Sequence, residues 1–415
     1  MQSLPRDRGL YMPTVVPQIK AEWYSELDQL SITDIAYHIC RSLIGDYIPA
    51  ADMRGIVDRA INFEAPLVQL DDDMASLELW HGPSLAFKDF GARFMAQLMA
   101  YFNRGDDRPL TILVATSGDT GGAVAAGFHN TPGIEVIILY PKGKVSHLQE
   151  QQLTTLGGNV TALEIEGTFD DCQALVKSAF VDDTLAGQYR LSSANSINIA
   201  RLIPQSFYYV DAYRQVQDKS KQVVVAVPSG NFGNLTAGLL ACRMGCPLHH
   251  FIAATNANDV VPRYLRSGNY SPRPSIATIS NAMDVGSPSN FTRMLALFDG
   301  DHKAMATAIS GYALDDDGTG VAMSDIYKQY GYIADPHGAI GFAALQQYMS
   351  TAQGATGIVL ETAHPAKFLD VMTAKLPAAN VAIPAALQAV AAKQKVAVEL
   401  STSYDSFRDW LASRS

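Results

Sequence analysis

One lysine stands within an apolar stretch flanked by glycines, HGPSLAFKDF at residues 81–90. Burial disfavours the charged form of an amine, so this lysine is either a surface side chain at a helix start or a nucleophile kept neutral. A neutral lysine amine can attack a carbonyl group and form a Schiff base. The stretch alone favours the surface lysine, and Lys88 becomes a candidate nucleophile only if other segments supply a binding site.

A glycine-rich segment, PSGNFGN at residues 228–234, follows an apolar run and precedes a helical pattern. Its backbone N–H groups can form an anion-binding nest beside a helix N-terminus. It lacks both the GxxxxGK[ST] and the GxGxxG patterns, so a single phosphate group is favoured over a nucleotide. The alternative is a glycine-rich turn that only lets a strand and a helix pack closely.

Three further segments place hydroxyl, amide and charged residues at predicted helix starts or strand ends: TSGDTGG (116–122), SSANSINIARL (192–202) and ETAHPAKF (361–368). Such groups suit a carboxylate or a phosphate, although Ser, Thr and Asp are also common helix caps. An anionic ligand would stabilise Arg201 near a helix start, where the dipole disfavours a cation; the alternative is a solvated arginine. His364 fits a core histidine better than a ligand.

Apolar runs alternate with amphipathic segments along most of the chain, which indicates βαβ units and parallel sheets. We expect a helix at 31–45 capped by Ser31, a long helix through Tyr213, and a helical segment after Leu376. Ligands of parallel sheets lie beyond the carboxyl ends of strands, where the polar segments occur. The expected strands lie at 111–118, 135–141, 159–165, 189–194, 222–230, 248–256 and from 354 onward.

Length and composition describe an ordinary globular protein. The 415 residues suffice for two or three domains, with 48% hydrophobic and 17% charged residues. The formal net charge of −10 and the lack of a basic block argue against nucleic acid and anionic membranes as partners. Four cysteines are too few for a disulfide scaffold and lack zinc spacing, so we expect no metal and, with no targeting signal visible, a cytoplasmic location.

Together, a lysine in an apolar stretch and a glycine-rich segment that can bind a phosphate group suggest pyridoxal 5'-phosphate. HGPSLAFKDFGARFMAQ, ATSGDTGGAVA, NSINIARL, VPSGNFGNLTAGLLA, NAMDVGSPSNFTR and ETAHPAKF resemble, in this order, the threonine synthase family. The resemblance implies a fold-type-II pyridoxal phosphate enzyme of the tryptophan synthase β-like superfamily: α/β, with two three-layer parallel-sheet domains and a helical N-terminal unit. The expected limits are 1–74 for the N-terminal domain, 75–92 and 214–375 for the cofactor domain, 93–213 for the smaller domain, and 376–415 for the C-terminal segment.

The resemblance implies that Lys88 is catalytic and forms the Schiff base. It implies cofactor contacts by Lys88, Phe87, Gly230, Asn231, Phe232, Gly233, Asn234 and Thr362, the last facing the pyridine nitrogen. We expect substrate contacts by Ser84, Thr116, Ser117, Asp119 and Thr120 near the amino-acid carboxylate or the ring, and by Asn195, Asn198 and Arg201 near the substrate phosphate or the ring. Asp119 more readily orients its loop, because a carboxylate does not accept another carboxylate.

The implied reaction is a lyase reaction that converts O-phospho-L-homoserine and water to L-threonine and phosphate. It is the last step of threonine biosynthesis, and the enzyme is expected to act as a monomer or a homodimer. One alternative is another fold-type-II enzyme, such as a serine or threonine dehydratase. The other is a catalytically silent protein that binds a partner, which would need a broken site, whereas Lys88, the GNFGN segment and Thr362 are intact.

Overall fold

A computed structural model describes residues 9–352 and 354–414, which form two compact units. The first unit contains Lys88–Arg201 and the chain from Ile383 onward, together with residues 9–11. The second contains Met12–Phe87 and Leu202–Ala382. Residues 1–8, where the expected N-terminal domain begins, and residue 415 lie outside the described residues. The domain limits drawn from the sequence stay a prediction.

The first unit is built on a five-stranded parallel sheet of order β11-β5-β4-β3-β6. Its inner strands are continuous apolar runs, as is typical of a sheet that is covered on both faces. The strands are β3 (Leu110–Ala115), β4 (Ile134–Pro141), β5 (Val160–Ile165), β6 (Arg190–Ser193) and β11 (Val398–Leu400). The helices are α4 (Lys88–Asn103), α5 (Asp119–Phe128), α6 (His147–Thr154), α7 (Phe169–Phe180), α8 (Asp183–Gln188), α9 (Ile199–Leu202), α18 (Ala385–Ala391) and α19 (Tyr404–Ala412).

The contacts of alternating residues of β3 show that the helices of the first unit form two layers. Ile112 and Val114 belong to a buried cluster with residues of α4 and α5. Leu113 and Ala115 belong to another cluster, with residues of α7 and α19. Because successive side chains of a strand point to opposite faces, α4 and α5 cover one face and α7 and α19 cover the other.

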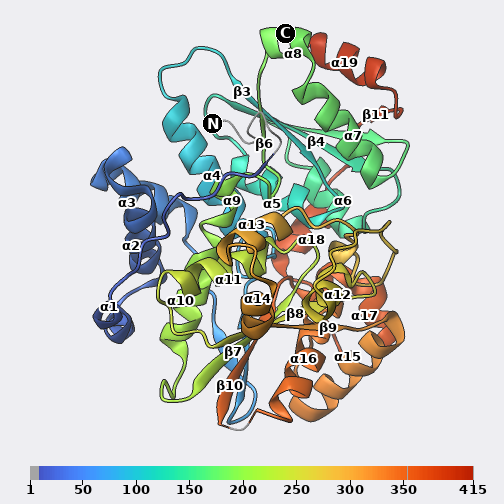
Figure 1. The fold of residues 1–415 in the computed structure, drawn as a ribbon. Coiled ribbons are helices and arrows are strands. Elements are labelled where there is room, and N and C mark those ends of the chain that lie inside the picture. The colour runs from blue at the N-terminus through green and yellow to red at the C-terminus, as the bar shows by residue number, and fades with distance from the viewer. Residues whose placement is uncertain (1–8, 353, 415) are drawn as a thin grey trace. The chain divides into compact units, whose positions relative to one another are not determined.

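The second unit is built on a six-stranded sheet of order β1-β2-β10-β7-β8-β9, in which only the edge pair β1–β2 is antiparallel. β7 and β10 lie side by side in Figure 1, with Ile358 opposite Val225. The strands are β1 (Leu67–Gln69), β2 (Met74–Glu78), β7 (Gln222–Pro228), β8 (His250–Thr255), β9 (Ile309–Ala313) and β10 (Ala355–Glu361). The helices that follow the N-terminal ones are α10 (Gln205–Gln215), α11 (Gly233–Arg243), α12 (Val260–Ser267), α13 (Phe291–Leu297), α14 (His302–Ala308), α15 (Asp316–Tyr330), α16 (Pro336–Met349) and α17 (Leu369–Lys375).

Helices also cover both faces of the second sheet. Ile252 of β8 lies in one buried cluster with Ile340 and Phe342 of α16. Its neighbour Phe251 packs instead against Gly238 of α11. The opposite directions of adjacent side chains therefore place α16 and α11 on opposite faces. The expected fold class, two three-layer α/β domains and a helical N-terminal region, is confirmed.

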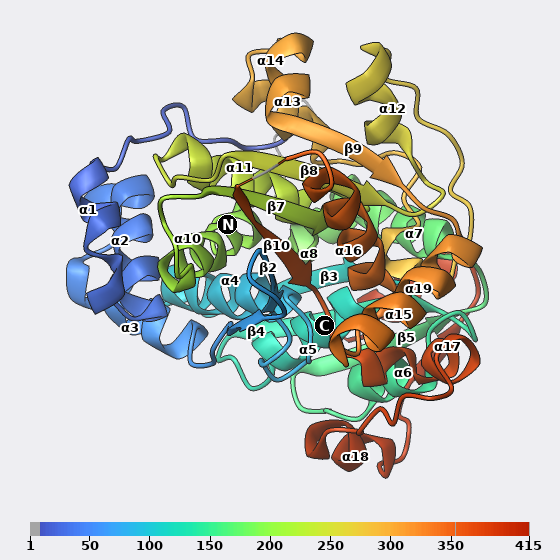
Figure 2. The same cartoon turned by 90° about the horizontal axis from the view of Figure 1, so that it is seen from below.

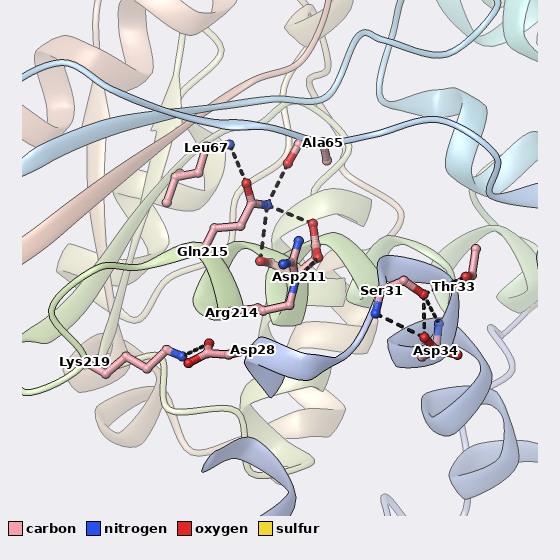
Figure 3. A network of polar contacts seen from close by, with 10 residues as sticks. All are labelled: Asp28, Ser31, Thr33, Asp34, Ala65, Leu67, Asp211, Arg214, Gln215 and Lys219. Atoms are coloured by element: carbon pink, nitrogen blue, oxygen red, sulfur yellow. Dashed lines mark hydrogen bonds and ion pairs between the residues drawn. The ribbon is translucent and has the colours of Figure 1, made fainter. Parts of the chain in front are cut away.

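The N-terminal helices α1 (Ala21–Ser25), α2 (Ile32–Ile44) and α3 (Ala50–Ala60) gather beside α10 in Figures 1 and 2. Ser31 caps α2 as expected, in a capping box with Asp34. Figure 3 shows how Gln215 of α10 holds the chain that leaves these helices. Its side chain accepts from the N–H of Leu67 and donates to the carbonyl of Ala65, both at 2.9 Å.

Two sequence predictions about helices need correction. The helix expected to run through Tyr213 is divided into α9 and α10, because Pro204 cannot supply the backbone N–H that a continuous helix needs. The segment after Leu376 is helical only in part and also contains β11. In the described part of the chain, none of the helices has the length and the apolar character needed to cross a bilayer.

Candidate active site

Lys88 is the first residue of α4, and Asp119 is the first residue of α5 in the same unit. The Nζ atom of Lys88 lies 3.7 Å from Oδ2 of Asp119. Both side chains are shielded, with 16% of Lys88 and 3% of Asp119 exposed. The sequence motifs FKD and TSGDTGG therefore meet, and the surface lysine that the first motif alone favours is wrong.

Two influences act in opposite directions on the charge of Lys88. Its place at the start of a helix disfavours a cation, because the helix dipole is positive there. The carboxylate of Asp119 favours the ammonium form. The sequence suggested a neutral lysine in apolar surroundings and did not reveal this carboxylate. The carboxylate stabilises a proton on the amine of Lys88.

Asp119 also orients its loop, as the sequence predicts, because its Oδ1 accepts a hydrogen bond from Nε2 of Gln149 at 3.0 Å. The hydroxyl of Thr116 accepts hydrogen bonds from the N–H groups of Gly118 and Gly121, at 3.0 and 2.8 Å. The Thr116 side chain therefore holds this loop in shape. Ser117 and Thr120 are half-buried, and among the described residues their side chains make no hydrogen bond, which leaves them available to a ligand.

The segment at 192–202 lies beside the same strand end. Nδ2 of Asn195 donates to the carbonyl of Ala115, the last residue of β3, at 3.1 Å. Nδ2 of Asn198 donates to the carbonyl of Ser193 at 3.4 Å. Arg201 is only 4% exposed, which excludes the solvated arginine considered from the sequence. Burial lowers the pKa of Arg201 to about 10, while the charge of Asp89 acts to raise it.

In the second unit, the GNFGN segment leads directly into α11. Phe232 has a left-handed backbone conformation, with φ at 59°. This conformation is uncommon for a residue with a side chain, and it recurs in backbone nests that bind anions. The segment therefore has the geometry expected of a phosphate cradle at a helix N-terminus.

Asn234 supplies a direct test of whether this segment fits a phosphate group. Its Oδ1 accepts hydrogen bonds from the hydroxyls of Tyr208 and Tyr209, both at 2.7 Å. Its Nδ2 is buried and, among the described residues, has no hydrogen-bond partner. A buried donor held in a fixed direction without an acceptor is costly. A phosphate oxygen is a suitable acceptor, so the residues present fit the phosphate of the expected cofactor.

The NAMDVGSPSNFTR motif braces this cradle, a role that the sequence did not reveal. Oδ1 of Asn231 accepts from the N–H of Ser289 at 2.6 Å, and its carbonyl accepts from Nδ2 of Asn290 at 3.0 Å. A Cβ atom on Gly230 would lie 2.6 Å from Cα of Met283, so only glycine permits this close approach. The motif was part of the family resemblance, but nothing in its composition indicated which segment it contacts.

The end of β10 supports the segment that leads to Lys88. The carbonyl of Thr362 accepts from the N–H of Phe87 at 2.8 Å, and Phe87 directly precedes Lys88 in the chain. The Thr362 hydroxyl makes no hydrogen bond among the described residues, so it is available to a ring nitrogen. Phe87 is half-buried. Leu85 has a φ of 57°, an unusual conformation for a branched side chain that is typical of strained functional segments.

Two polar residues near this segment, Ser84 and His364, are held by contacts within the second unit. Ser84 is 1% exposed, and its carbonyl accepts from Nζ of Lys367 at 2.9 Å. His364 caps the short helix η4 (Pro365–Phe368) through Nδ1, as a core histidine does. Burial lowers the pKa of His364 to about 4, so its ring is neutral near pH 7.

Three family models match the chain. "Pyridoxal-phosphate dependent enzyme" matches residues 74–361, "Threonine synthase N terminus" matches 1–61, and "Threonine synthase, C-terminal" matches 338–410. A threonine synthase of Haemophilus influenzae is 48% identical over 376 residues, which are 88% of this chain and 85% of the relative. One of Escherichia coli is 47% identical over 377 residues, which are 90% and 86%.

Solved structures are similar over the whole length. The crystal structure of threonine synthase from Escherichia coli has a TM-score of 0.92 at 42% identity and covers 100% of this chain and 95% of its own. The structure of PLP bound threonine synthase from Brucella melitensis has a TM-score of 0.92 at 36% identity, with the same coverage.

Proposed function

The chain belongs to the threonine synthase family of pyridoxal phosphate-dependent enzymes, and we propose that it converts O-phospho-L-homoserine and water to L-threonine and phosphate. The observation that carries this proposal is the similarity to threonine synthases over most of the chain, including the N-terminal region that this family adds. The intact lysine, phosphate cradle and Thr362 support an active enzyme over a silent binding protein.

The bound cofactor withdraws electrons from the substrate, which makes the protons on Cα and then on Cβ acidic. Lys88 would hold the cofactor through Nζ, and its amine would accept a proton from Cα and then from Cβ of the substrate and supply protons to Cγ and Cα. Asp119, 3.7 Å from Nζ, stabilises the ammonium form while Lys88 holds a proton. A positioned base of this kind contributes about 10²- to 10⁴-fold to the rate of a proton transfer.

The same lines of support suggest which residues would hold the cofactor. The backbone of residues 230–234 and the unpartnered Nδ2 of Asn234 would hold its phosphate. The hydroxyl of Thr362 would face the pyridine nitrogen, and Phe87 would pack near the ring. A hydroxyl leaves this nitrogen largely unprotonated, so the ring withdraws fewer electrons than it would beside a carboxylate.

The residues proposed for the substrate come from three of the sequence motifs. Ser117 and Thr120 have hydroxyls available for the amino-acid carboxylate, in a loop that Thr116 and Asp119 hold in shape. Ser84 is proposed for the same region. Asn195, Asn198 and Arg201 are proposed for the phosphate that leaves from Cγ.

The test is release of inorganic phosphate from O-phospho-L-homoserine by purified enzyme with pyridoxal phosphate. We expect equal amounts of phosphate and L-threonine, and no turnover in a folded Lys88→Ala variant. Keto acid formed from L-threonine, without phosphate release from O-phospho-L-homoserine, would identify a dehydratase instead. A protein that binds no pyridoxal phosphate would contradict both enzyme hypotheses.

We also propose a cytoplasmic location and a monomer or homodimer. The location is supported by four cysteines without a disulfide, three of them buried. Size-exclusion chromatography with light scattering tests the oligomeric state.

A further inference from the structure

Glu361 ends β10, immediately before Thr362, and its side chain is completely buried. Among the described residues, neither of its carboxyl oxygens has a hydrogen-bond partner of normal geometry. It packs against the first turn of α16, where a Cβ atom on Gly338 would lie 1.8 Å from Oε1. A buried carboxylate with no partner is among the most costly groups in a protein, so this carboxyl needs an explanation.

Asp335 is the second buried carboxyl at this place and the N-cap of α16. Its Oδ1 accepts from the N–H of His337 at 2.7 Å and from Nδ1 of the same residue at 2.5 Å. Its Oδ2 is buried and, in the described part of the chain, has no partner. Asp335 therefore has the features of an ionised cap, and one of its oxygens remains able to accept.

His337 does not neutralise the two carboxyls. Its Nε2 accepts a hydrogen bond from the N–H of Ala282 at 3.2 Å, so this nitrogen carries no proton. The proton of the ring is then on Nδ1, which donates to Asp335. The imidazole is neutral, and its tautomer is fixed by the backbone on one side and by a carboxylate on the other.

Several other titratable groups lie in this region. Glu78 of β2 lies opposite Glu361 in the sheet, and it accepts a hydrogen bond from Tyr332. Lys367 donates to Ser84, and the pKa of buried His364 is lowered to about 4. Asp284 adds a further acid near His337. Among the described residues, no lysine or arginine forms an ion pair with Glu361 or Asp335.

We propose that Glu361 and Asp335 share a single proton, carried by Glu361 and donated to Oδ2 of Asp335, and that this acid pair positions the end of β10. The shared proton joins two of the three buried acid oxygens that have no partner and leaves one negative charge, which lies at a helix N-terminus. Burial and the negative charge of Asp335 raise the pKa of Glu361 well above its ordinary value, in agreement with this arrangement.

The pair matters for the active site because of what the end of β10 holds. The carbonyl of Glu361 accepts from the N–H of Leu79, and the carbonyl of Thr362 accepts from the N–H of Phe87. Glu361 is thus a positioning residue for Thr362 and for the segment that carries Lys88, an inference that rests on the proposed function of those two residues. Loss of the shared proton would leave two adjacent buried anions and push this strand end apart.

Infrared spectroscopy of the holoenzyme at pH 8 tests the shared proton without relying on activity. The carbonyl band of a protonated carboxylic acid, distinct from the carboxylate bands, is expected in the wild type. It should diminish in Glu361→Gln and persist in the matched control Glu78→Gln. A wild type without such a band, or an undiminished band in Glu361→Gln, would overturn the proposal. Failure of the phosphate-release assay would instead contradict the proposed function, so the two are distinguishable.

A second variant and a kinetic measurement separate positioning from mere packing. Asp335→Asn removes the neighbouring charge, so the band should disappear at a lower pH than in the wild type; an unmoved midpoint contradicts the pair. Above the pH at which the wild-type band disappears, kcat/KM of the wild type should fall about tenfold per pH unit. The same decrease is expected in Glu78→Gln, and it should be absent in Glu361→Gln. If the wild type lacks the infrared band and is stabilised by potassium but not by tetramethylammonium, a cation takes the place of the proton and the proposal is wrong.

Discussion

Substitution of Asn234 by aspartate tests the phosphate cradle with the least disturbance of its surroundings. Asparagine and aspartate have the same shape, and an aspartate oxygen can still accept from Tyr208 and Tyr209. The change replaces only Nδ2, the buried donor that has no partner among the described residues. Alanine would be a poorer choice, because it would also remove the side-chain oxygen that accepts from both buried tyrosine hydroxyls at 2.7 Å.

The magnitude follows from the hydrogen bond that is lost. A hydrogen bond to a charged group contributes about 1.5–3 kcal/mol, and 1.4 kcal/mol corresponds to a tenfold change in affinity. Asn234→Asp should therefore weaken binding of pyridoxal phosphate about 10- to 150-fold, before repulsion between the carboxylate and the phosphate is added. Affinity should recover as the pH falls, because a protonated carboxyl can donate again.

The assay is titration of the apoenzyme with pyridoxal phosphate, and separately with pyridoxal, followed by absorbance. The loss of affinity should be confined to pyridoxal phosphate, since pyridoxal has no phosphate to contact Asn234. Tyr208→Phe is the matched control, because it removes one hydrogen bond to the Asn234 side chain without changing the charge of that side chain. An equal loss for both ligands, or unchanged affinity, would refute the assignment of the 230–234 segment as the cradle.

Three further variants test the loop, a buried histidine and a helix cap. Thr116→Val removes the acceptor of two loop N–H groups and should destabilise the holoenzyme by about 2–3 kcal/mol; an unchanged melting temperature would show that the loop does not need this hydroxyl. His364 has a pKa lowered to about 4 by burial, against about 6.5 in the unfolded chain. Between about pH 6.5 and pH 4, the unfolded chain therefore binds a proton at this histidine and the folded protein does not. As the pH decreases through this range, the folding constant decreases by up to about tenfold per pH unit. His364→Asn should flatten this acid-side loss, and unfolding curves from pH 7 to pH 4 with an unaltered slope would contradict it. Ser31→Ala should cost about 1 kcal/mol through loss of the capping box, which chemical denaturation measures, whereas Ser42→Ala on the same helix should cost less.

The sequence predicted β3, β4, β5, β6, β7, β8 and β10, because parallel strands covered on two faces appear as unbroken apolar runs. It did not predict the strands β1, β2, β9 and β11, nor the order of the strands in the sheets. β2 pairs with β10 although Met74 and Gly357 are far apart in the chain, and such pairing depends on contacts that no local pattern records. The division between α9 and α10 depends on Pro204, and the apolar periodicity of the segment does not reveal this effect.

The residue types of the candidate site were predictable, but their partners were not. The sequence contains both Lys88 and Asp119, yet only the packing of α4 against α5 brings their side chains to 3.7 Å. The donor of Asn234 acquires meaning only from Tyr208 and Tyr209, which fix its direction. Glu361 was part of a quoted motif, but its importance comes from a second acid, Asp335, on a different element.

The pairing of Lys88 with Asp119 bears on the proposal that one amine serves as a nucleophile and as a base. Asp119 begins α5, where the helix dipole stabilises its negative charge. Lys88 begins α4, where the dipole opposes a positive charge. The carboxylate of Asp119 and the dipole of α4 thus act in opposite directions on a proton carried by Nζ of Lys88. Removal of the carboxylate by Asp119→Asn should therefore lower kcat more than it raises KM, and a variant with normal kcat would show that the dipole and the cofactor alone suffice.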